Sequence, residues 1–250
     1  CVETVIQSYY GFNAVNSKSG AIRSANKYLR NKSAKRVFEE ITLLNKKFGI
    51  QLFRCQDTNF LTVNRKMLNE LADLIDKSNL DILLYIETRP DGITLRDIDL
   101  LKKLKVDGVG MGIELVHEDF REENLKRFAH QDKVIKGFEL LKEVGIKRTA
   151  YNIIGLPNET EEMIIDTIIF NKKLNPDNIT VAYYSPYHGT EQQKIADKLN
   201  LFNTNQDNVD GQIRSTTISN ELDASLLDYY KKNFVDFVKE NKAIERFSPT

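Results

Sequence analysis

The chain contains few of the residues that build disulfides and common metal sites. Cysteine occurs only as Cys1 and Cys55, so a disulfide framework is not expected, and a cytosolic setting would keep both thiols reduced. The three histidines, His117, His130 and His188, are not spaced as zinc ligands. No Gly-x-Ser-x-Gly motif and no P-loop is present, so neither of these motifs points to a function.

Net charge and long apolar runs are missing as well. Lys plus Arg and Asp plus Glu number 36 each, so overall charge does not draw the chain to nucleic acid or anionic lipid, and we expect no nucleic-acid partner. No apolar run approaches the roughly 20 residues that a membrane-spanning helix requires, and the N-terminus has no basic-then-apolar signal pattern. These absences predict a cytoplasmic protein and leave small-molecule substrates open.

The sequence does contain a regular alternation of strand-length apolar runs and amphipathic helical stretches. Five runs suit the strands of a buried parallel sheet, at 50–54, 81–86, 107–113, 148–154 and 178–184. Apolar residues at helical spacing predict helices between Ser33 and Gly49 and at 64–77, 95–104, 131–144, 159–174, 191–199 and 221–241. A charged insertion at 117–127 interrupts this pattern.

The alternation predicts an α/β fold, a partial (β/α) TIM-like barrel of parallel strands with a C-terminal helical extension. A doubly wound sheet would instead have a glycine-rich phosphate turn after its first strand, and the glycines of Asp107–Gly112 lie within a strand. Such glycines indicate close approach by a ligand or by backbone. We expect a barrel-like core over residues 1–199 and an extension over 200–250, with a helix near 221–241.

Polar side chains follow the predicted strands where each strand ends. In a parallel α/β sheet the working site lies beyond the carboxyl ends of the strands, so these residues should converge. Carboxylates together with an Arg at one mouth can hold a zwitterionic ligand such as an amino acid. Each residue taken singly has an equally good explanation as a solvated strand end. The candidates are Asp57, Glu87, Arg89, Glu114, Asn152 and Tyr184.

Several stretches of the chain, in order, resemble the radical S-adenosylmethionine (radical SAM) enzymes. They include QDTNFLTVNRK, GMGIE, VIKGFELLKEVGI and IIGLPNETEEMIIDTIIFNKKLNPDNITVAYYSPYHGTE. The resemblance covers roughly residues 1–199, and it is closest to the branch whose members often carry an N-terminal cobalamin-binding domain. Each motif taken alone has modest specificity, but the shared order and spacing of the motifs make a coincidental match improbable.

The resemblance implies a 4Fe-4S cluster and S-adenosylmethionine as cofactors, and cobalamin where a domain outside this chain binds it. It places Cys1 as a cluster ligand and puts Asp57, Glu87, Arg89, Glu114, Asn152 and Tyr184 at S-adenosylmethionine. Such an enzyme cleaves S-adenosylmethionine reductively to a 5′-deoxyadenosyl radical or drives cobalamin-dependent methyl transfer. The implied partners are a small-molecule or lipid-like substrate and an electron donor such as flavodoxin or ferredoxin.

The sequence departs from the family pattern in two places. The family motif Cys-x-x-x-Cys-x-x-Cys holds the cluster through three thiolates, and only Cys1 matches it, as the third. We therefore expect a fragment without the first barrel strand, inactive by itself. The second departure is Val116–His117, where the branch commonly has Gly-Asn.

The alternative to a radical SAM enzyme is a non-catalytic barrel-like module that binds a small zwitterion. A metal-dependent lyase or aldolase ranks last.

Overall fold

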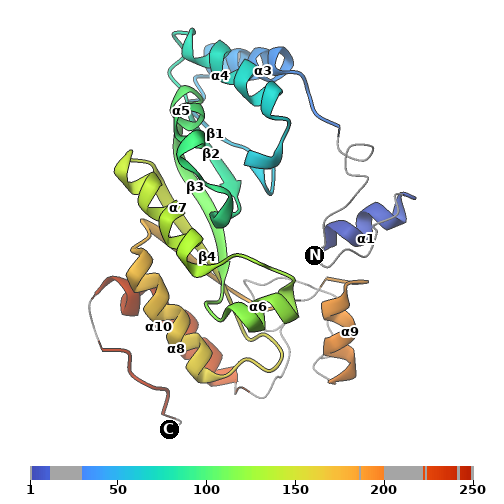
Figure 1. Cartoon of the computed structure of the whole chain (residues 1–250), viewed down its shortest axis with the longest axis vertical. Coiled ribbons are helices and arrows are strands. Elements are labelled where there is room, and N and C mark those ends of the chain that lie inside the picture. Colours follow the sequence, from blue (N-terminus) through green and yellow to red (C-terminus); the bar gives the residue numbers. More distant parts are fainter. Residues whose placement is uncertain are drawn as a thin grey trace.

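The computed structural model describes residues 2–11, 30–185, 187–199, 222, 224–240 and 243–248. Its centre is a sheet of five parallel strands, each paired with the next one along the chain (Figure 1). This order is that of a barrel wall, and the strands form a half-barrel. The prediction of five parallel strands is confirmed, with bounds that differ by one or two residues. The strands are β1 (Leu52–Arg54), β2 (Leu83–Thr88), β3 (Val106–Glu114), β4 (Lys147–Ile154) and β5 (Asn178–Tyr183).

The helices begin and end where capping residues place their limits. Ser33 caps α3 by accepting a hydrogen bond from the Arg36 amide, and Gly49 ends it at a φ of 67°, which glycine adopts without steric cost. Thr94 and Asp97 form a reciprocal capping box at the start of α5. The helices are α1 (Val2–Tyr9), α3 (Ala34–Phe48), α4 (Arg65–Asp76), α5 (Leu95–Lys103), α6 (Glu118–Leu125), α7 (Gln131–Glu143), α8 (Glu161–Leu174), α9 (Glu191–Lys198) and α10 (Ala224–Lys239), with short 3-10 turns η1 (Phe60–Thr62) and η2 (Pro90–Gly92).

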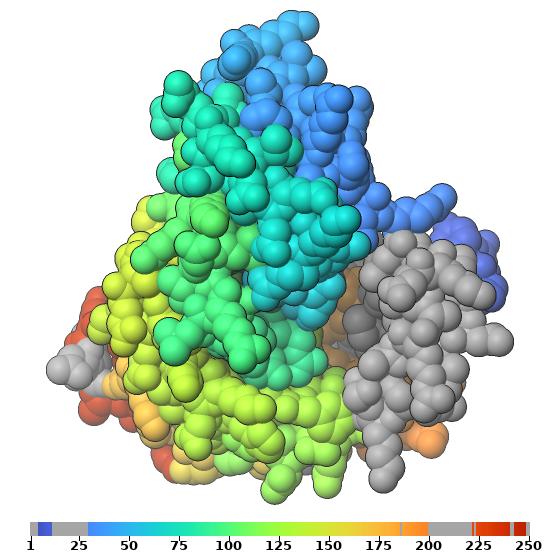
Figure 2. All heavy atoms as spheres, turned by 45° about the horizontal axis from the view of Figure 1, so that its top comes forward, coloured from blue at the N-terminus to red at the C-terminus, as the bar shows by residue number. Residues whose placement is uncertain are grey.

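One face of the sheet carries the main core. Ile86, Val109, Met111 and Ala150 are completely buried there, among apolar side chains of α4, α5 and α7. Burying an aliphatic side chain of this size stabilises the fold by about 1.5–3 kcal/mol. Helices α3 and α4 lie side by side at one end of this layer (Figure 1). In Figure 2 the blue to cyan atoms of this region form the upper part of the molecule. Because strand side chains alternate, the residues between these core positions face the inner side of the half-barrel.

The C-terminal helix α10 belongs to the same layer of helices. It packs against α8 and β5 (Figure 1), and Tyr230 and Phe234 are completely buried in an apolar cluster with residues of both elements. Helix α9 instead contacts the end of β3 and the segment after β4, since Ala196 packs with Leu115 and Leu156. The predicted helix near 221–241 is therefore found as α10, whereas the predicted connection at 201–220 lies outside the described residues.

The charged insertion at 117–127 contains a helix that the sequence analysis did not predict, since residues 118–125 form α6. Strand β1 is hydrogen-bonded to β2 on one side, and no second partner strand occurs among the described residues. No helix in the described ranges is long and apolar enough to cross a membrane. The division at residue 199, the missing first strand and the cytoplasmic location remain predictions.

Candidate ligand site at the carboxyl edge of the sheet

Glu114 is the buried acid at the end of β3. Its backbone has a φ of 63°, and the pairing of β3 with β4 shifts register beside it. Gly112, two residues earlier, leaves room for the Glu114 carboxylate, which would have to shift if residue 112 had a Cβ. Arg127 reaches this carboxylate with 3.4 Å between Nη2 and Oε1. Burial raises the pKa of Glu114 above its ordinary value, while Arg127 and Arg121 act in the opposite direction.

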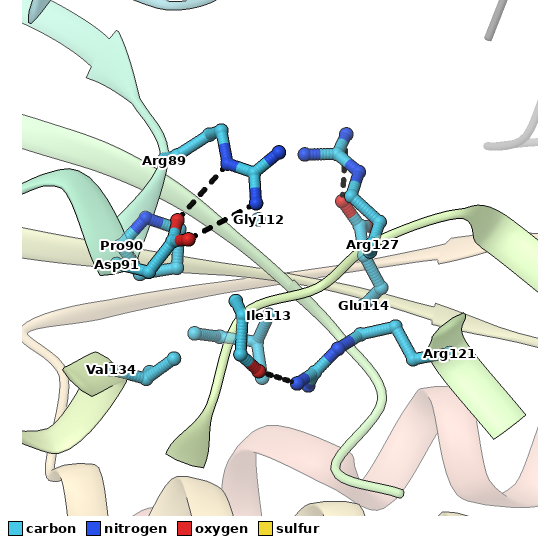
Figure 3. Close-up of a pocket in the computed structure, with 10 residues that line it drawn as sticks. Arg89, Pro90, Asp91, Gly112, Ile113, Glu114, Arg121, Arg127 and Val134 are labelled. Atoms are coloured by element: carbon cyan, nitrogen blue, oxygen red, sulfur yellow. Dashed lines mark hydrogen bonds and ion pairs between the residues drawn. The ribbon is translucent and has the colours of Figure 1, made fainter. Parts of the chain in front are cut away.

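Glu114 and Arg127 line a pocket at the carboxyl edge of the sheet, and two more arginines, Arg89 and Arg121, line it as well (Figure 3). Arg89, after β2, donates from Nε and Nη2 to the two oxygens of Asp91, at 3.0 and 3.1 Å. Burial would raise the pKa of Asp91, but the hydrogen bonds and charge of Arg89 outweigh it and hold that pKa below its ordinary value. Figure 3 shows the guanidinium groups of Arg89 and Arg127 facing each other across the pocket.

Arg121 fixes the segment between Glu114 and Arg127. Its guanidinium is buried and donates to the backbone oxygens of Leu115, at 2.8 Å, and of Ala129. One side chain thus joins the chain just after Glu114 to the chain just after Arg127. Its Nε is buried without a hydrogen-bond partner among the described residues. Sequence analysis did not select Arg121 or Arg127, because only the fold of α6 brings them back to the strand end.

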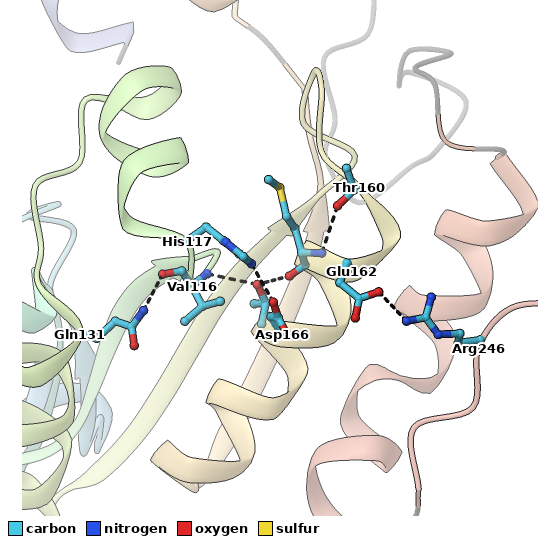
Figure 4. A network of polar contacts seen from close by, with 9 residues as sticks. Val116, His117, Gln131, Thr160, Glu162, Asp166 and Arg246 are labelled. Atoms are coloured by element: carbon cyan, nitrogen blue, oxygen red, sulfur yellow. Dashed lines mark hydrogen bonds and ion pairs between the residues drawn. The ribbon is translucent and has the colours of Figure 1, made fainter.

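A second anchor of this segment lies at Val116 and His117, where the sequence departs from the family pattern (Figure 4). The Val116 amide donates to the Thr167 hydroxyl at 3.1 Å, and His117 Nε2 lies 3.0 Å from Asp166 Oδ2. Gln131 donates to the Val116 backbone oxygen at 3.2 Å. The departure therefore ties the β3–α6 connection to α8.

Glu87 and Arg54 lie on the inner face of the sheet. Their side chains form an ion pair between β2 and β1. The Tyr151 hydroxyl donates to Glu87 Oε1 at 3.2 Å, and its oxygen lies 2.8 Å from that of Tyr85. Glu87 is thus at the strand ends as predicted, but it is engaged by protein partners.

The remaining predicted residues lie in different surroundings. Asp57 is exposed after β1, and in the same motif it is Asn59 that joins the strands, accepting from the Thr88 hydroxyl at 2.9 Å. Asn152 is buried on the helix side, where it exchanges amide hydrogen bonds with Asn171 at 2.8 and 3.3 Å. Tyr184 is buried and donates to the backbone and side-chain oxygens of Gln192. The structure therefore groups Glu114 and Arg89 but separates Asn152 from them.

Glu159 is the second buried carboxyl group at this edge. Its Oε2 accepts from the Gly155 and Leu156 amides at 2.5 and 3.0 Å, while Oε1 has no partner among the described residues. Desolvation raises the pKa of Glu159 to about 8. Glu159 thus closes the turn between β4 and α8 through these two backbone hydrogen bonds.

Metal ligands are scarce in the part of the chain that is described. No group of three His, Cys, Asp or Glu side chains there is placed to hold a metal ion. Cys55 is half-buried, and burial raises the pKa of its thiol to about 11, so it stays protonated. Cys55 packs against the main core, as a small apolar residue does. Cys1, the predicted cluster ligand, lies outside the described residues.

Known proteins are similar to this chain in sequence and in fold. Over 178 residues the chain is 32% identical to the anaerobic magnesium-protoporphyrin IX monomethyl ester cyclase of Rubrivivax gelatinosus, covering 69% of this chain and 31% of the cyclase. It is 30% identical to an uncharacterized methyltransferase of Pyrococcus horikoshii, covering 70% of this chain and 38% of that protein. The chain thus spans about a third of the length of these curated relatives.

The fold resembles that of the radical S-adenosylmethionine methyltransferase TsrM from Kitasatospora setae, solved with cobalamin and a [4Fe-4S] cluster bound. The TM-score is 0.61 at 18% identity, over 67% of this chain and 32% of TsrM. This likeness supports the predicted partial TIM-like barrel. The model of the Radical SAM superfamily matches residues 13–170. The family resemblance is confirmed, and the chain belongs to the radical SAM superfamily.

Proposed function

We propose that this chain forms the S-adenosylmethionine-binding wall of a radical SAM enzyme that reductively cleaves S-adenosylmethionine to a 5′-deoxyadenosyl radical. The observation that carries the proposal is the contact of Arg127 with buried Glu114 at the end of β3, with Arg89 across the same pocket. The carboxyl ends of parallel strands are where α/β barrels bind their ligands. Opposite charges at this edge suit the zwitterionic methionyl end of S-adenosylmethionine.

Arg127 is the cation best suited to the methionyl carboxylate. Arg89 already makes two hydrogen bonds to Asp91, which satisfy one edge of its guanidinium. Arg127 has a looser contact of 3.4 Å with Glu114, and 42% of its side chain is exposed. A carboxylate that binds between the two guanidinium groups gains charge-assisted hydrogen bonds. Exposed Asp57 after β1 is the acid that remains available to the ammonium group.

The iron–sulfur cluster of the family does not fit the described side chains. A cluster of this type is held by thiolates, and Cys55, the free cysteine in the described ranges, has a thiol with its pKa raised to about 11. We therefore expect the 250-residue chain alone to bind S-adenosylmethionine without cleaving it. The cluster ligands of the working enzyme, including Cys1, remain part of the proposal.

The remaining parts of the proposal concern the working enzyme as a whole. A methyltransferase among the relatives and the cobalamin in TsrM support cobalamin-dependent methyl transfer as the net reaction, with cobalamin bound outside this chain. The substrate is proposed to be a small or lipid-like molecule. Reductive cleavage consumes an electron, so a donor such as flavodoxin or ferredoxin is proposed as the partner.

The deciding experiment compares the chain with a version extended upstream of Cys1. Both are reconstituted anaerobically with iron and sulfide, reduced, and assayed for 5′-deoxyadenosine. We expect cluster absorption and 5′-deoxyadenosine from the extended version and neither from the chain alone. If the extended version binds S-adenosylmethionine but forms no cluster and no product, the proposal is wrong, and a non-catalytic module that binds a zwitterion is favoured instead.

A further inference from the structure

The inner face of the sheet carries a line of polar side chains across β1, β2 and β4. The oxygens of Tyr85 and Tyr151 lie 2.8 Å apart, and the Tyr151 hydroxyl donates to Glu87 at 3.2 Å. Arg54 forms an ion pair with the same carboxylate. Tyr85 and Tyr151 are half-buried, and 29% of the Glu87 side chain and 57% of the Arg54 side chain are exposed. The line is therefore partly open to solvent along its whole length.

Two glycines of strand β3 leave room for the Tyr85 and Tyr151 side chains. A Cβ on Gly108 would lie 2.8 Å from the Tyr85 ring, and a Cβ on Gly110 would lie 2.5 Å from Tyr151 Oη and 2.7 Å from Tyr85 Oη. Real Cβ atoms essentially never lie this close to other atoms, so a larger residue at either position would require the tyrosine rings to shift. These are the strand glycines that predicted close approach by a ligand or backbone. The structure shows that two tyrosine side chains make that approach.

The hydrogen bonds have one direction. The Glu87 carboxylate, paired with Arg54, accepts hydrogen bonds only, so the Tyr151 hydroxyl must donate to it. The Tyr151 oxygen then accepts from the Tyr85 hydroxyl. The Tyr85 oxygen is left with its acceptor lone pairs at the start of the line. Desolvation, aided by Tyr85, raises the pKa of Tyr151 above its ordinary value, so the phenol is neutral at rest.

We propose that Tyr85, Tyr151 and Glu87 form a proton relay that deprotonates a ligand bound over the inner face of the sheet. The ligand class is one with an acidic hydroxyl or a protonated nitrogen next to the Tyr85 oxygen. The ligand O–H or N–H bond breaks and its proton passes to Tyr85, the Tyr85 proton passes to Tyr151, and the Tyr151 proton passes to Glu87. Both phenols end neutral, the ligand has lost one proton, and Glu87 releases that proton to water.

Arg54 and the Tyr151 hydroxyl both contact the Glu87 carboxylate, so this side chain is fixed at the end of the relay. Other tyrosine–carboxylate contacts in the molecule differ from this one. Tyr183 donates directly to Asp228 at 2.6 Å and Tyr230 directly to Glu161 at 2.6 Å, so in both contacts no second phenol stands between the tyrosine and the carboxylate. Only at Tyr85 and Tyr151 do the described residues place two phenols in series.

The direct test follows the tyrosines by nuclear magnetic resonance. The full chain, labelled at the tyrosine ring carbon that bears the oxygen, is titrated through the range in which Glu87 ionises. We expect the signals of Tyr85 and Tyr151 to shift together, Tyr151→Phe to abolish the shift at Tyr85, and Glu87→Gln to abolish both shifts. Tyr183→Phe is the matched control, because it removes a phenol–carboxylate bond elsewhere and should leave both shifts. Amide spectra verify that each variant is folded.

The relay is overturned if the Tyr85 signal does not follow Glu87, or if it still does so in Tyr151→Phe. This readout needs neither cluster nor S-adenosylmethionine, so it separates the relay from the proposed function, on which the relay rests only for its place in a reaction. In a reconstituted enzyme, Tyr85→Phe and Tyr151→Phe should slow substrate conversion by about 100-fold or more, as loss of acid–base catalysis does, while S-adenosylmethionine cleavage continues. Unchanged conversion would also overturn the relay.

Discussion

At the scale of single residues, two buried carboxyl groups lie at the carboxyl edge of the sheet. Glu114 and Glu159 are 8% and 2% exposed, and both have a pKa raised by burial. They differ in their surroundings, because Glu114 has Arg127 nearby whereas Glu159 has backbone amides. A carboxyl group whose pKa is raised by burial is better able to donate a hydrogen bond or to exchange a proton than an exposed one.

Glu159 predicts a pH dependence of stability. Its pKa is about 8 in the folded chain against an ordinary value of 4.5, so unfolding releases a proton between these pH values. The group's contribution is complete below pH 4.5 and is lost as the pH rises through about 8. Urea unfolding should show that the original chain loses roughly a few kcal/mol of unfolding free energy between pH 5 and pH 8. Glu159→Gln should not show this loss. Glu162→Gln, at an exposed neighbouring site, should lose as much unfolding free energy as the original chain. The same change of unfolding free energy with pH in all three proteins would refute the account.

At the scale of elements, β3 shows how one strand serves two faces. Val109 and Met111 are fully buried among the helices, while Gly108 and Gly110 admit the tyrosines on the other face. The sequence displays both patterns, yet it does not reveal that Tyr85 and Tyr151 are the side chains above the glycines. That information depends on the pairing of β2 and β4 with β3, which is a tertiary property.

Gly110→Ala should destabilise the chain by about 1–3 kcal/mol, as overpacking does. The added Cβ would meet both phenol oxygens, at 2.5 and 2.7 Å. Gly92→Ala is the control, since a Cβ there meets nothing within 4 Å. Chemical denaturation measures both variants. If Gly110→Ala is as stable as Gly92→Ala, the tyrosines do not lie over β3 as described.

The same scale explains which site residues could be predicted. Apolar runs indicated the strands, so the residues that follow them, such as Glu114 and Arg89, were found at the edge. Asn152 was selected on the same ground, but β4 (KRTAYNII) mixes polar and apolar residues on both of its faces, so its sequence gives no sign that Asn152 faces α8. Arg127 could not be found at all, because a helix folded within a charged insertion carries it back to Glu114.

At the scale of the whole molecule, α10 unites the C-terminal region with the sheet. It buries Tyr230 and Phe234 in the cluster over β5 and α8. The sequence predicted a helix there but assigned it to an extension, because weakly periodic residues separate it from the barrel-like core. Apolar burial on this scale argues that core and helix unfold together.

Phe234→Ala should therefore destabilise the entire chain. Phe234 is completely buried, and truncating a core phenylalanine costs about 3–5 kcal/mol. Val235→Ala is matched to it in the same helix, since Val235 is 41% exposed, and should change stability little. Calorimetry should show one transition that moves to lower temperature in Phe234→Ala. A separate transition that alone responds would instead support an independent C-terminal unit.

The central claim is that the Glu114–Arg127 edge binds S-adenosylmethionine, and titration calorimetry of the chain with this ligand tests it most directly. A hydrogen bond to a charged group contributes about 1.5–3 kcal/mol, so Arg127→Ala should weaken binding by roughly 10- to 100-fold. Arg246→Ala is the control, because Arg246 pairs with Glu162 of α8, and it should bind like the original chain. Undiminished binding by Arg127→Ala, or no binding by the original chain, would contradict the account.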